Sequence, residues 1–344
     1  MANIRDVAAI AGVSPSTVSR VLSGSARVSA NKRNLVYQAV AELQYDIRRG
    51  QQRATNGCEA KIGIIIQKHA AIDLAGHPAF STAISSFEKE MQSLNRSSEL
   101  IMLDDLLLKN FSLLTEQEMA AYFIVGTNEE QEDILLPYLR ERRLPYIILN
   151  RWVDDKFINY VNIDDLIAAQ QATEYLIGIK HTKIAFIGGN KNYRNSKLRI
   201  AGFEAAMQAA GLPIDSSHIL QGEYTEEYGY KVGDELIAMD RDNRPSAALV
   251  SSDIIAAGLQ RRLRELGMHL PEDFSMVGWG DFTIASYVTP ALTTIKMPTS
   301  EMGTQAAIAL DNMIRYPDVM GTHILMKAPL IIRDSCIEYK GNPT

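Results

Sequence analysis

The chain has 344 residues, of which 46% are apolar and 22% are charged. This length exceeds one ordinary domain and allows a sizeable packed core. It contains no apolar run of about 18 residues, so we expect no transmembrane helix. The first residues lack the apolar core of a secretory signal, so we expect a cytoplasmic protein. Two distant cysteines, Cys58 and Cys336, suggest neither a disulfide framework nor a metal site.

Charge is divided unevenly along the chain. Residues 1–61 carry nine Lys and Arg against four Asp and Glu, so this segment has a net charge of +5. The whole chain has a net charge of −6, so the remaining residues carry −11. A basic head on an acidic body suggests that the head contacts a polyanion, although many solvated faces are also basic.

The first part of the head predicts two short helices around a tight turn. Apolar residues recur at helical spacing over residues 4–11, and Gly12 ends that helix. Ser14 is suited to the N-cap of a second helix, and Pro15 to its first position, where no N–H is needed.

The rest of the head predicts two further helical segments. The second helix buries Val18 and Leu22 and ends near Gly24, and a third begins after Ser29 and runs to about Tyr45. The residues expected to face inward from the third helix are Leu35, Val36, Ala39, Val40 and Leu43.

A helix, a tight glycine turn and a short second helix form the geometry that lays a recognition helix in the major groove. The first turn of that helix points to Pro15, Ser16 and Arg20 as base contacts. Arg20 can donate two hydrogen bonds to guanine, worth about 1–3 kcal/mol of discrimination. Phosphate contacts are expected from Ser14, Thr17, Ser19, Arg27 and Ser29. A three-helix packing unit without a DNA role is the alternative at this point.

After a polar linker at residues 46–60, short apolar runs alternate with amphipathic stretches. This alternation predicts right-handed βαβ units with parallel strands. About 280 residues are too many for one sheet, so we expect two α/β lobes with a ligand cleft at the carboxyl ends of the strands. Strands are expected at 61–66, 99–103, 122–125, 146–149, 161–163, 183–187, 247–250, 275–278 and 292–295. Helices are expected at 79–94, 129–142, 164–179, 198–210, 226–239 and 254–266.

The sequence of the head closely resembles the lactose-repressor/galactose-repressor (LacI/GalR) family of bacterial transcriptional regulators. The matching elements are DVA at 6–8, AGVS at 11–14, TVSRVL at 17–22, VS at 28–29 and AELQY at 41–45. The likeness continues in YIILNR at 146–151, VNIDD at 161–165, KIAFIGG at 183–189, LRIAGFEAAM at 198–207, the S-D-x-x-A-x-G stretch at 252–258, LPEDFSMVGWGD at 270–281 and PALTTIK at 290–296. The resemblance therefore covers nearly the whole chain.

The resemblance implies an all-α helix-turn-helix head followed by a two-lobed, periplasmic-binding-protein-like α/β sensor. The expected head is 1–45, the hinge or linker 46–60, and the effector-binding and dimerisation domain 61–344. Its N-lobe would span about 61–163 and 296–325, and its C-lobe about 164–295 and 326–340. The resemblance also implies a homodimer on a pseudo-palindromic, double-stranded operator. The expected function is repression of a carbohydrate-use operon under control of a small-molecule effector, a sugar.

The linker departs from the family. In relatives this segment forms a hinge helix on operator DNA, and a leucine wedges into the minor groove. That leucine's position holds Ala54, and Gly50 lies inside the would-be helix, where glycine costs about 1 kcal/mol. Arg48, Arg49 and Arg53 can follow phosphates. We predict weaker kinking and a steeper salt dependence than in relatives, with a plain flexible tether as the alternative.

Ile4 and Tyr45, at the two ends of the head, complete the set of residues expected at the DNA. In the sensor, sugar recognition needs planar hydrogen-bonding groups and an aromatic face. By resemblance, Arg199 matches the arginine that grips the effector, and Tyr224 an aromatic residue that stacks on it. The other expected effector contacts are Phe80, Asn150, Arg151, Ser252, Asp253 and Asp281.

Several of these residues have simpler interpretations. Arg199 can form an ion pair on a helix face, Tyr224 can pack in a loop, and Asp253 can cap the following helix. Gly280 stands where many sugar-responsive relatives have an aspartate, and the adjacent Asp281 can equally cap a helix. Where relatives often have asparagine, this chain has Ser252. The stretch from 103 to 120 also looks short for the family. These departures define the effector class less well than the family, and they indicate no particular sugar.

The sequence favours a regulator over an enzyme. It contains no phosphate-binding loop, no G-x-S-x-G motif and no H-E-x-x-H motif, so we expect no catalytic residues, no cofactor and no metal. It has no terminal leucine heptads, which favours a dimer over a tetramer. We expect no membrane partner. A regulator controlled by a phosphorylated partner protein and a sugar-binding protein without a DNA role remain alternatives.

Overall fold

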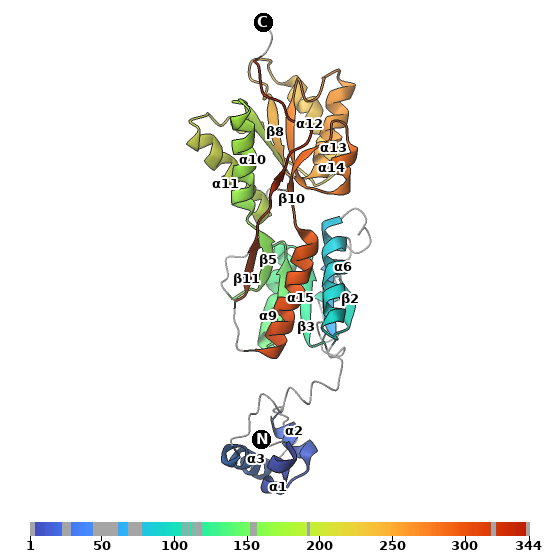
Figure 1. Ribbon diagram of the computed structural model, residues 1–344, viewed down its shortest axis with the longest axis vertical. Coiled ribbons are helices and arrows are strands. Elements are labelled where there is room, and N and C mark those ends of the chain that lie inside the picture. The colour runs from blue at the N-terminus through green and yellow to red at the C-terminus, as the bar shows by residue number, and fades with distance from the viewer. Residues whose placement is uncertain are drawn as a thin grey trace.

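A computed structural model of the chain shows a helical head and two α/β lobes (Figure 1). The structure describes residues 4–22, 29–43, 61–67, 78–104, 107, 108, 111, 114, 119–151, 157–190, 193–317 and 321–341. Within these residues, every helix is too short or too polar to cross a membrane.

The head consists of α1 (Ile4–Ala11), α2 (Pro15–Leu22) and α3 (Ala30–Glu42). The prediction for the turn is confirmed, because α2 begins at Pro15 and the Ser14 hydroxyl oxygen accepts a hydrogen bond from the Thr17 amide at 3.2 Å. The buried core of the head contains Val7, Ala8, Ala11, Val18, Val21, Val36, Ala39 and Val40.

The prediction that Leu35 faces inward is wrong. Its side chain is 42% exposed, whereas Val36, Ala39 and Val40 are buried. These three residues follow the i, i+3, i+4 spacing of one helix face, and Leu35 lies about 100° around the helix from Val36. Leu43 packs at the edge of the core, as expected.

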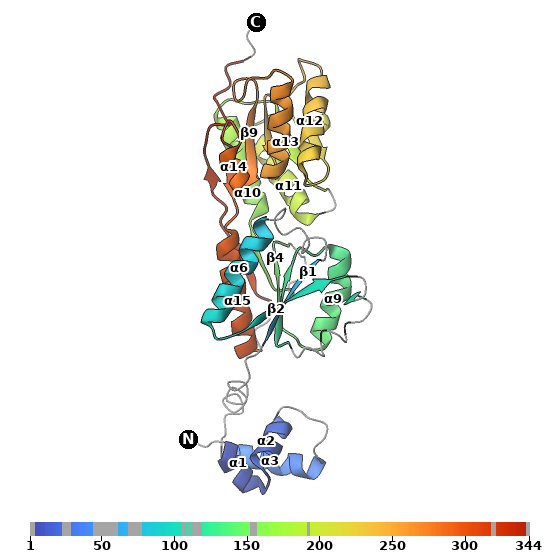
Figure 2. The same ribbon diagram turned by 90° about the vertical axis from the view of Figure 1, so that its right-hand side faces the viewer.

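The N-lobe is built on a sheet whose strands pair only in parallel, in the order β11-β5-β4-β3-β1-β2. Its strands are β1 (Ile62–Gln67), β2 (Ser98–Leu103), β3 (Ala121–Val125), β4 (Tyr146–Leu149), β5 (Tyr160–Ile163) and β11 (His323–Met326). The helices α6 (Pro78–Ser93) and α15 (Thr299–Arg315) lie side by side on one face, and α9 (Glu129–Glu141) covers the other (Figure 2).

The C-lobe repeats this plan with the strand order β12-β10-β9-β8-β6-β7. Its strands are β6 (Ile184–Gly188), β7 (Ile219–Gln221), β8 (Ala247–Val250), β9 (Ser275–Gly280), β10 (Thr293–Lys296) and β12 (Leu330–Ile331), of which only β12 pairs antiparallel among those described. Helices α10 (Asp165–Gly178) and α11 (Arg194–Ala209) cover one face of the sheet. The other face carries α12 (Glu226–Ala238), α13 (Asp253–Glu265) and the short α14 (Thr283–Tyr287) (Figure 1).

The expected strands all occur, each within one or two residues of its expected ends. The helix α11 begins at Arg194, four residues before its expected start at Leu198. The sequence analysis did not identify α14, α15, β7, β11 and β12. Most of the stretch from 103 to 120, which looked short for the family, lies outside the described residues.

Close helix packing in both lobes depends on glycine. A Cβ atom placed at Gly258 of α13 would lie 2.0 Å from the carbonyl oxygen of Glu226, and one at Gly229 of α12 would lie 2.0 Å from that of Ile255. In the N-lobe, a Cβ at Gly303 of α15 would lie 2.1 Å from the carbonyl oxygen of Ala83 on α6. A side chain at any of these positions would push two backbones apart.

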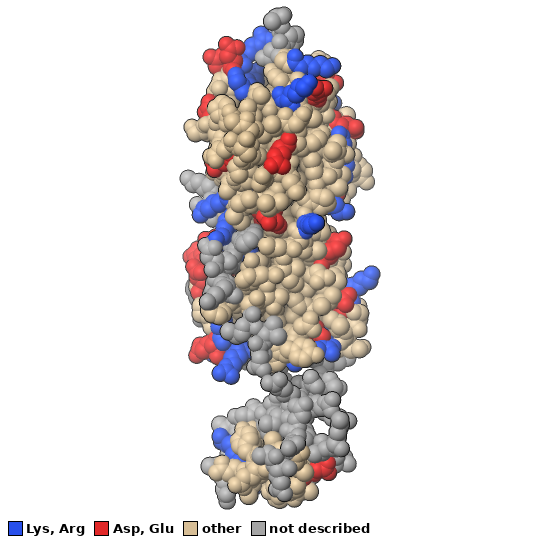
Figure 3. Space-filling view, turned by 60° about the vertical axis from the view of Figure 1, so that its left-hand side comes forward, with Lys and Arg blue, Asp and Glu red and all other residues tan. Residues whose placement is uncertain are grey.

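Charged side chains of both signs are scattered over the visible face of the molecule, with broad uncharged areas between them (Figure 3).

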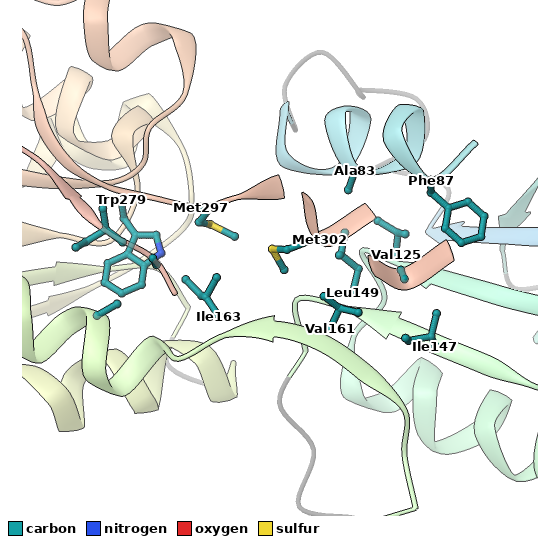
Figure 4. Packing of buried hydrophobic residues seen from close by; sticks show 14 of the residues in the cluster. Ala83, Phe87, Val125, Ile147, Leu149, Val161, Ile163, Trp279, Met297 and Met302 are labelled. Atoms are coloured by element: carbon teal, nitrogen blue, oxygen red, sulfur yellow. The ribbon is translucent and has the colours of Figure 1, made fainter. Parts of the chain in front are cut away.

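The hydrophobic core continues from one lobe into the other. Beneath the surface, one buried cluster includes Phe186 of the C-lobe sheet and Phe123 of the N-lobe sheet. Ile163 and Met297 lie between Trp279 of the C-lobe and Met302 at the start of α15 (Figure 4). The segments that connect the lobes are therefore part of the core.

Candidate effector site between the lobes and DNA-binding head

The head presents the expected recognition helix. Ser14 and Pro15 are exposed at the start of α2, and the hydroxyls of Ser14 and Thr17 lie 2.9 Å apart. Ser29 is exposed just before α3. Ile4 begins α1, and Ser16, Ser19 and Arg20 lie on α2, but their side chains are outside the described residues, as are Arg27, Tyr45, Arg48, Arg49, Arg53 and Ala54.

The carboxyl ends of the strands meet where the lobes join. Asn150 directly follows β4 in the left-handed conformation, with φ of 55°. The side-chain amide of Asn195, in the first turn of α11, donates to the Asn150 backbone oxygen at 3.1 Å and to its side-chain oxygen at 3.2 Å. These two hydrogen bonds connect the N-lobe to the C-lobe.

Arg151 is buried beside this contact and is held by the N-lobe. Its Nε donates to Glu132 at 3.1 Å, and its Nη2 lies 3.3 Å from the carboxylate of Glu129. Burial raises the pKa of Glu132, and the charge of Arg151 opposes that rise. Nη2 makes no hydrogen bond within the described structure. The guanidinium also lies 5.9 Å from the ring centre of Tyr193, which belongs to the C-lobe.

Tyr224 lies against the end of a C-lobe strand. A Cβ atom at Gly189 would come within 2.0 Å of the Tyr224 ring, so the ring can occupy this place only because residue 189 is glycine. The phenol and the Ser196 hydroxyl form a hydrogen bond of 3.0 Å. The ring of Tyr193 stacks with that of Tyr224, with centres 6.4 Å apart. Tyr193 therefore lies between the Tyr224 ring of its own lobe and the Arg151 guanidinium of the N-lobe.

Arg199 forms a buried ion pair inside the C-lobe. Its Nε donates to Asp165 at 2.7 Å, its Nη1 donates to Ser251 at 2.8 Å, and its guanidinium lies 4.2 Å from the ring centre of Trp279. Burial raises the pKa of Asp165, and the charge of Arg199 opposes that rise. The side chain of Arg199 is thus engaged in an ion pair, which was the simpler interpretation considered from the sequence, and this pair is buried between α10 and α11.

The two acidic residues predicted as effector contacts, Asp253 and Asp281, also bond to other groups of the C-lobe. Ser252, not Asp253, caps α13 by accepting a hydrogen bond from the Ile255 amide at 3.4 Å. Asp253 accepts from the Thr294 hydroxyl at 2.6 Å and from the Phe282 amide at 2.9 Å. Burial raises the pKa of Asp253 to about 6.

Asp281 does not cap the next helix, because Phe282 occupies the N-cap of α14. Its carboxylate instead pairs with Arg333 at 2.5 Å. Phe80, in the first turn of α6, packs beside the end of β3, where a Cβ atom at Gly126 would lie 2.9 Å from its ring. Gly126 has a φ of 65°, a conformation that favours glycine.

The structure brings Asn150, Arg151 and Tyr224 to the same junction and gives Arg199 a place in the C-lobe core. Sequence reasoning did not single out Tyr193 and Asn195, which provide the C-lobe side of the contacts. Both lie just before the family stretch at 198–207, so extending α11 by one turn would have identified them. Among the described residues, no three His, Cys, Asp or Glu side chains are grouped to hold a metal ion.

Comparisons with known proteins agree with this architecture. Residues 3–46 match the family described as "Bacterial regulatory proteins, lacI family", and residues 173–336 match the "Periplasmic binding protein-like domain". The probable transcriptional repressor ExuR of Bacillus subtilis is 27% identical over 97% of this chain and 98% of its own length. The structure of a complex of the transcriptional regulator CelR with cellobiose has a TM-score of 0.73 and 26% identity, covering 98% of this chain and all of that one.

The operator-bound lac repressor dimer shares the fold, with a TM-score of 0.70 and 24% identity over 98% of this chain and 99% of that one. A helix-turn-helix head joined to a two-lobed, periplasmic-binding-protein-like domain defines a class of DNA-binding transcriptional regulators. The head of this chain is a LacI-family helix-turn-helix domain, and the chain is similar over nearly its whole length to regulators of that family. The resemblance and the fold class predicted from the sequence are thereby confirmed.

Proposed function

We propose that this regulator represses carbohydrate-use genes and that a sugar bound between its lobes changes its affinity for operator DNA. It acts as a homodimer on a pseudo-palindromic operator in the cytoplasm, where the chromosomal DNA lies, and it has no catalytic role. The observation that carries this proposal is the likeness, over 98% of the chain, to a regulator solved with cellobiose.

The contacts at the lobe junction support a sugar as the ligand. Tyr193 and Tyr224 offer aromatic faces, which suit the apolar side of a sugar ring. The side-chain oxygen of Asn195 and Nη2 of Arg151 are buried and make no hydrogen bond within the described structure. Buried polar groups generally find a partner, and sugar hydroxyls both donate and accept hydrogen bonds.

The same contacts suggest how a sugar would act on the DNA-binding head. Asn195 connects the lobes directly, so a ligand that inserts between the Asn150 loop and α11 must bind one relative position of the lobes better than another. A ligand shifts such an equilibrium only by its difference in affinity for the two positions. In a dimer whose interface spans both lobes, this shift changes the spacing of the two heads.

The test begins with the full chain and duplex DNA selected from a random pool by repeated rounds of binding. Fluorescence anisotropy then measures operator affinity alone and with a panel of neutral sugars that includes cellobiose. We expect operator binding at least about a thousandfold tighter than binding to unrelated DNA. One sugar in the panel should change that affinity by about 5- to 150-fold.

Arg20→Ala is the matched control for sequence reading. Loss of a contact worth about 1–3 kcal/mol should weaken operator binding by about 5- to 150-fold while leaving sugar binding intact. Failure to select any preferred duplex would contradict the DNA-binding role. A preferred duplex whose affinity responds to no sugar would contradict the sugar as effector.

A further inference from the structure

The far end of the C-lobe holds a small basic pocket that the effector site does not use. Its lining includes Lys183, just before β6, and Ser246, just before β8. These residues lie at the amino ends of parallel strands, whereas the lobes meet at the carboxyl ends. The pocket and Asn195 therefore lie at opposite ends of the C-lobe strands. Lysine and arginine side chains, with a few acidic ones, are visible at this end of the molecule (Figure 3).

The lining is rich in positive charge and in hydroxyl groups. Lys183, Arg241 and Arg244 stand against a single carboxylate, that of Asp242, which gives the lining a net charge of +2. Lys183 donates to the backbone oxygen of Asp242 and not to its carboxylate. This hydrogen bond therefore does not neutralise the positive charge of Lys183. The remaining lining residues, Thr182, Ser246 and Tyr339, all carry hydroxyls that can donate to an anion.

Arg244 contributes a donor that lacks a partner. Its Nη2 donates to the backbone oxygens of Ile237 at 2.6 Å and Met239 at 3.2 Å, which fixes the guanidinium at the end of α12. Its Nε is buried and makes no hydrogen bond within the described structure. A buried donor without a partner costs about 1–3 kcal/mol. Arg244 itself lines the pocket, so its fixed positive charge would stabilise an anion bound there.

The geometry points to a binding site for a phosphate group, either free or carried as a monoester. The pocket has a volume of about 80 Å³. Since one water needs roughly 10–15 Å³ on this measure, the space suits a group of about five heavy atoms. A phosphate monoester carries a charge of about −1.5 to −2 at pH 7, which matches the net charge of the lining.

A bound phosphate would also join three separate parts of the C-lobe. The pocket combines the start of β6, the loop from α12 to β8 and Tyr339 of the C-terminal segment. That segment is already held here by His181, whose ring contacts Ser246 at 2.8 Å and the Ile337 backbone oxygen at 3.2 Å. Phosphate binding should therefore stabilise the folded C-lobe and not directly move the lobes.

Isothermal titration calorimetry on the full chain tests this proposal at constant ionic strength, with inorganic phosphate, glucose 6-phosphate and glucose as probes. Arg241→Gln removes an exposed charge from the lining and spares Arg244, which fixes the end of α12. Lys231→Gln is the matched control, because it removes one exposed charge from the same lobe outside the pocket.

Inorganic phosphate or its ester should bind the unmodified chain, and Arg241→Gln should weaken that binding by about tenfold. Lys231→Gln should change it by less than about twofold. Tighter binding of the ester identifies a sugar phosphate, and equal binding identifies the free anion. The proposal is overturned if neither phosphate compound binds, or if the two variants weaken binding equally. Binding that survives Arg241→Gln unchanged would also overturn it, since the phosphate would then lie elsewhere.

Discussion

The N-lobe and the C-lobe repeat one strand order, in which the first strand lies between the second and the third and a sixth strand comes from the returning chain. Each lobe also buries one arginine near the carboxyl ends of its strands. Arg199 of the C-lobe is paired with Asp165, bonded to Ser251 and stacked on Trp279. Arg151 of the N-lobe is paired with glutamates but keeps one nitrogen without a hydrogen bond, beside an aromatic ring of the other lobe.

Arg151 follows the fourth strand of its lobe, and Arg199 lies on the helix after the first strand of its lobe. Two buried arginines at different places in a repeated fold therefore serve different purposes. The C-lobe uses its charged residues to fix its own helices and strands to one another. The N-lobe presents a partly unsatisfied arginine and the strained Asn150 to the junction. On the C-lobe side of the junction, Asn195 also keeps a side-chain oxygen without a hydrogen bond, so we expect a ligand there to contact both lobes.

The largest expected effect comes from breaking the ion pair of the C-lobe. Arg199→Met leaves the carboxylate of Asp165 buried without its cation, and should lower the free energy of unfolding by about 3–5 kcal/mol. Arg151→Met should cost less, about 1–3 kcal/mol, because Glu132 retains the Thr127 hydroxyl as a donor at 2.7 Å. Urea unfolding measures both values, and equal losses in the two variants would remove the contrast between the lobes.

The next effect is a pH dependence that belongs to the C-lobe. Asp253 has a pKa of about 6 in the folded chain and about 4 when unfolded. Between these values the folded chain keeps a proton that the unfolded chain has lost, so stability from this group falls as the pH rises from about 4 to about 6. Asp253→Asn should remove this component, which amounts to about 2–3 kcal/mol.

The measurement is the free energy of unfolding of both chains at several pH values. The stability of Asp253→Asn relative to the unmodified chain should rise from about pH 4 to about pH 6 and stay constant above it. A difference that is the same at every pH would show that burial does not shift the titration of Asp253.

A third prediction concerns the close contact of α12 and α13. Gly258→Ala places a methyl group against the backbone of α12, and should destabilise the chain by about 1–3 kcal/mol. Gly178→Ala is the control, because this exposed position at the end of α10 has no atom within 4 Å of the added Cβ. Thermal unfolding should separate the two variants, and similar melting temperatures would contradict the close packing.

The smallest expected effect lies between the lobes. Asn195→Ala removes two hydrogen bonds to Asn150 but no core packing, so stability should change by about 1 kcal/mol or less. Its effect on the effector should be larger, because the same side chain lies at the proposed site, and we expect sugar affinity to weaken by about tenfold. Asn312→Ala, at an exposed position on α15, should change neither quantity. Unchanged sugar affinity in Asn195→Ala would place the sugar elsewhere.

The sequence predicted much of this fold because its information is local. Ser14 and Pro15 start a helix through their own backbone preferences, and buried strands such as β4 are continuous apolar runs. The short strands β7 and β12 were missed because two or three residues carry no periodicity. Leu35 was misplaced because an apolar residue on a helix need not lie on its buried face.

The candidate site was harder to predict because its contacts join distant parts of the chain. Resemblance located Arg199, but its partner Asp165 is 34 residues away on another helix. Nothing in the local sequence indicates that Asp253 bonds to Thr294, or that Asn195 reaches the other lobe. Residue identities gave the candidates, and only the packing of the two sheets shows how they are engaged. The positions of the domain boundaries and the DNA contacts remain predictions.

The most direct test of the central claim is a reciprocal binding measurement on the full chain. Operator affinity is measured with and without the effector sugar, and sugar affinity with and without saturating operator. Since coupling between two sites is a single free energy, both ratios should be equal, at about 5- to 150-fold. A sugar that binds with the same affinity to the free and to the operator-bound protein would contradict the account.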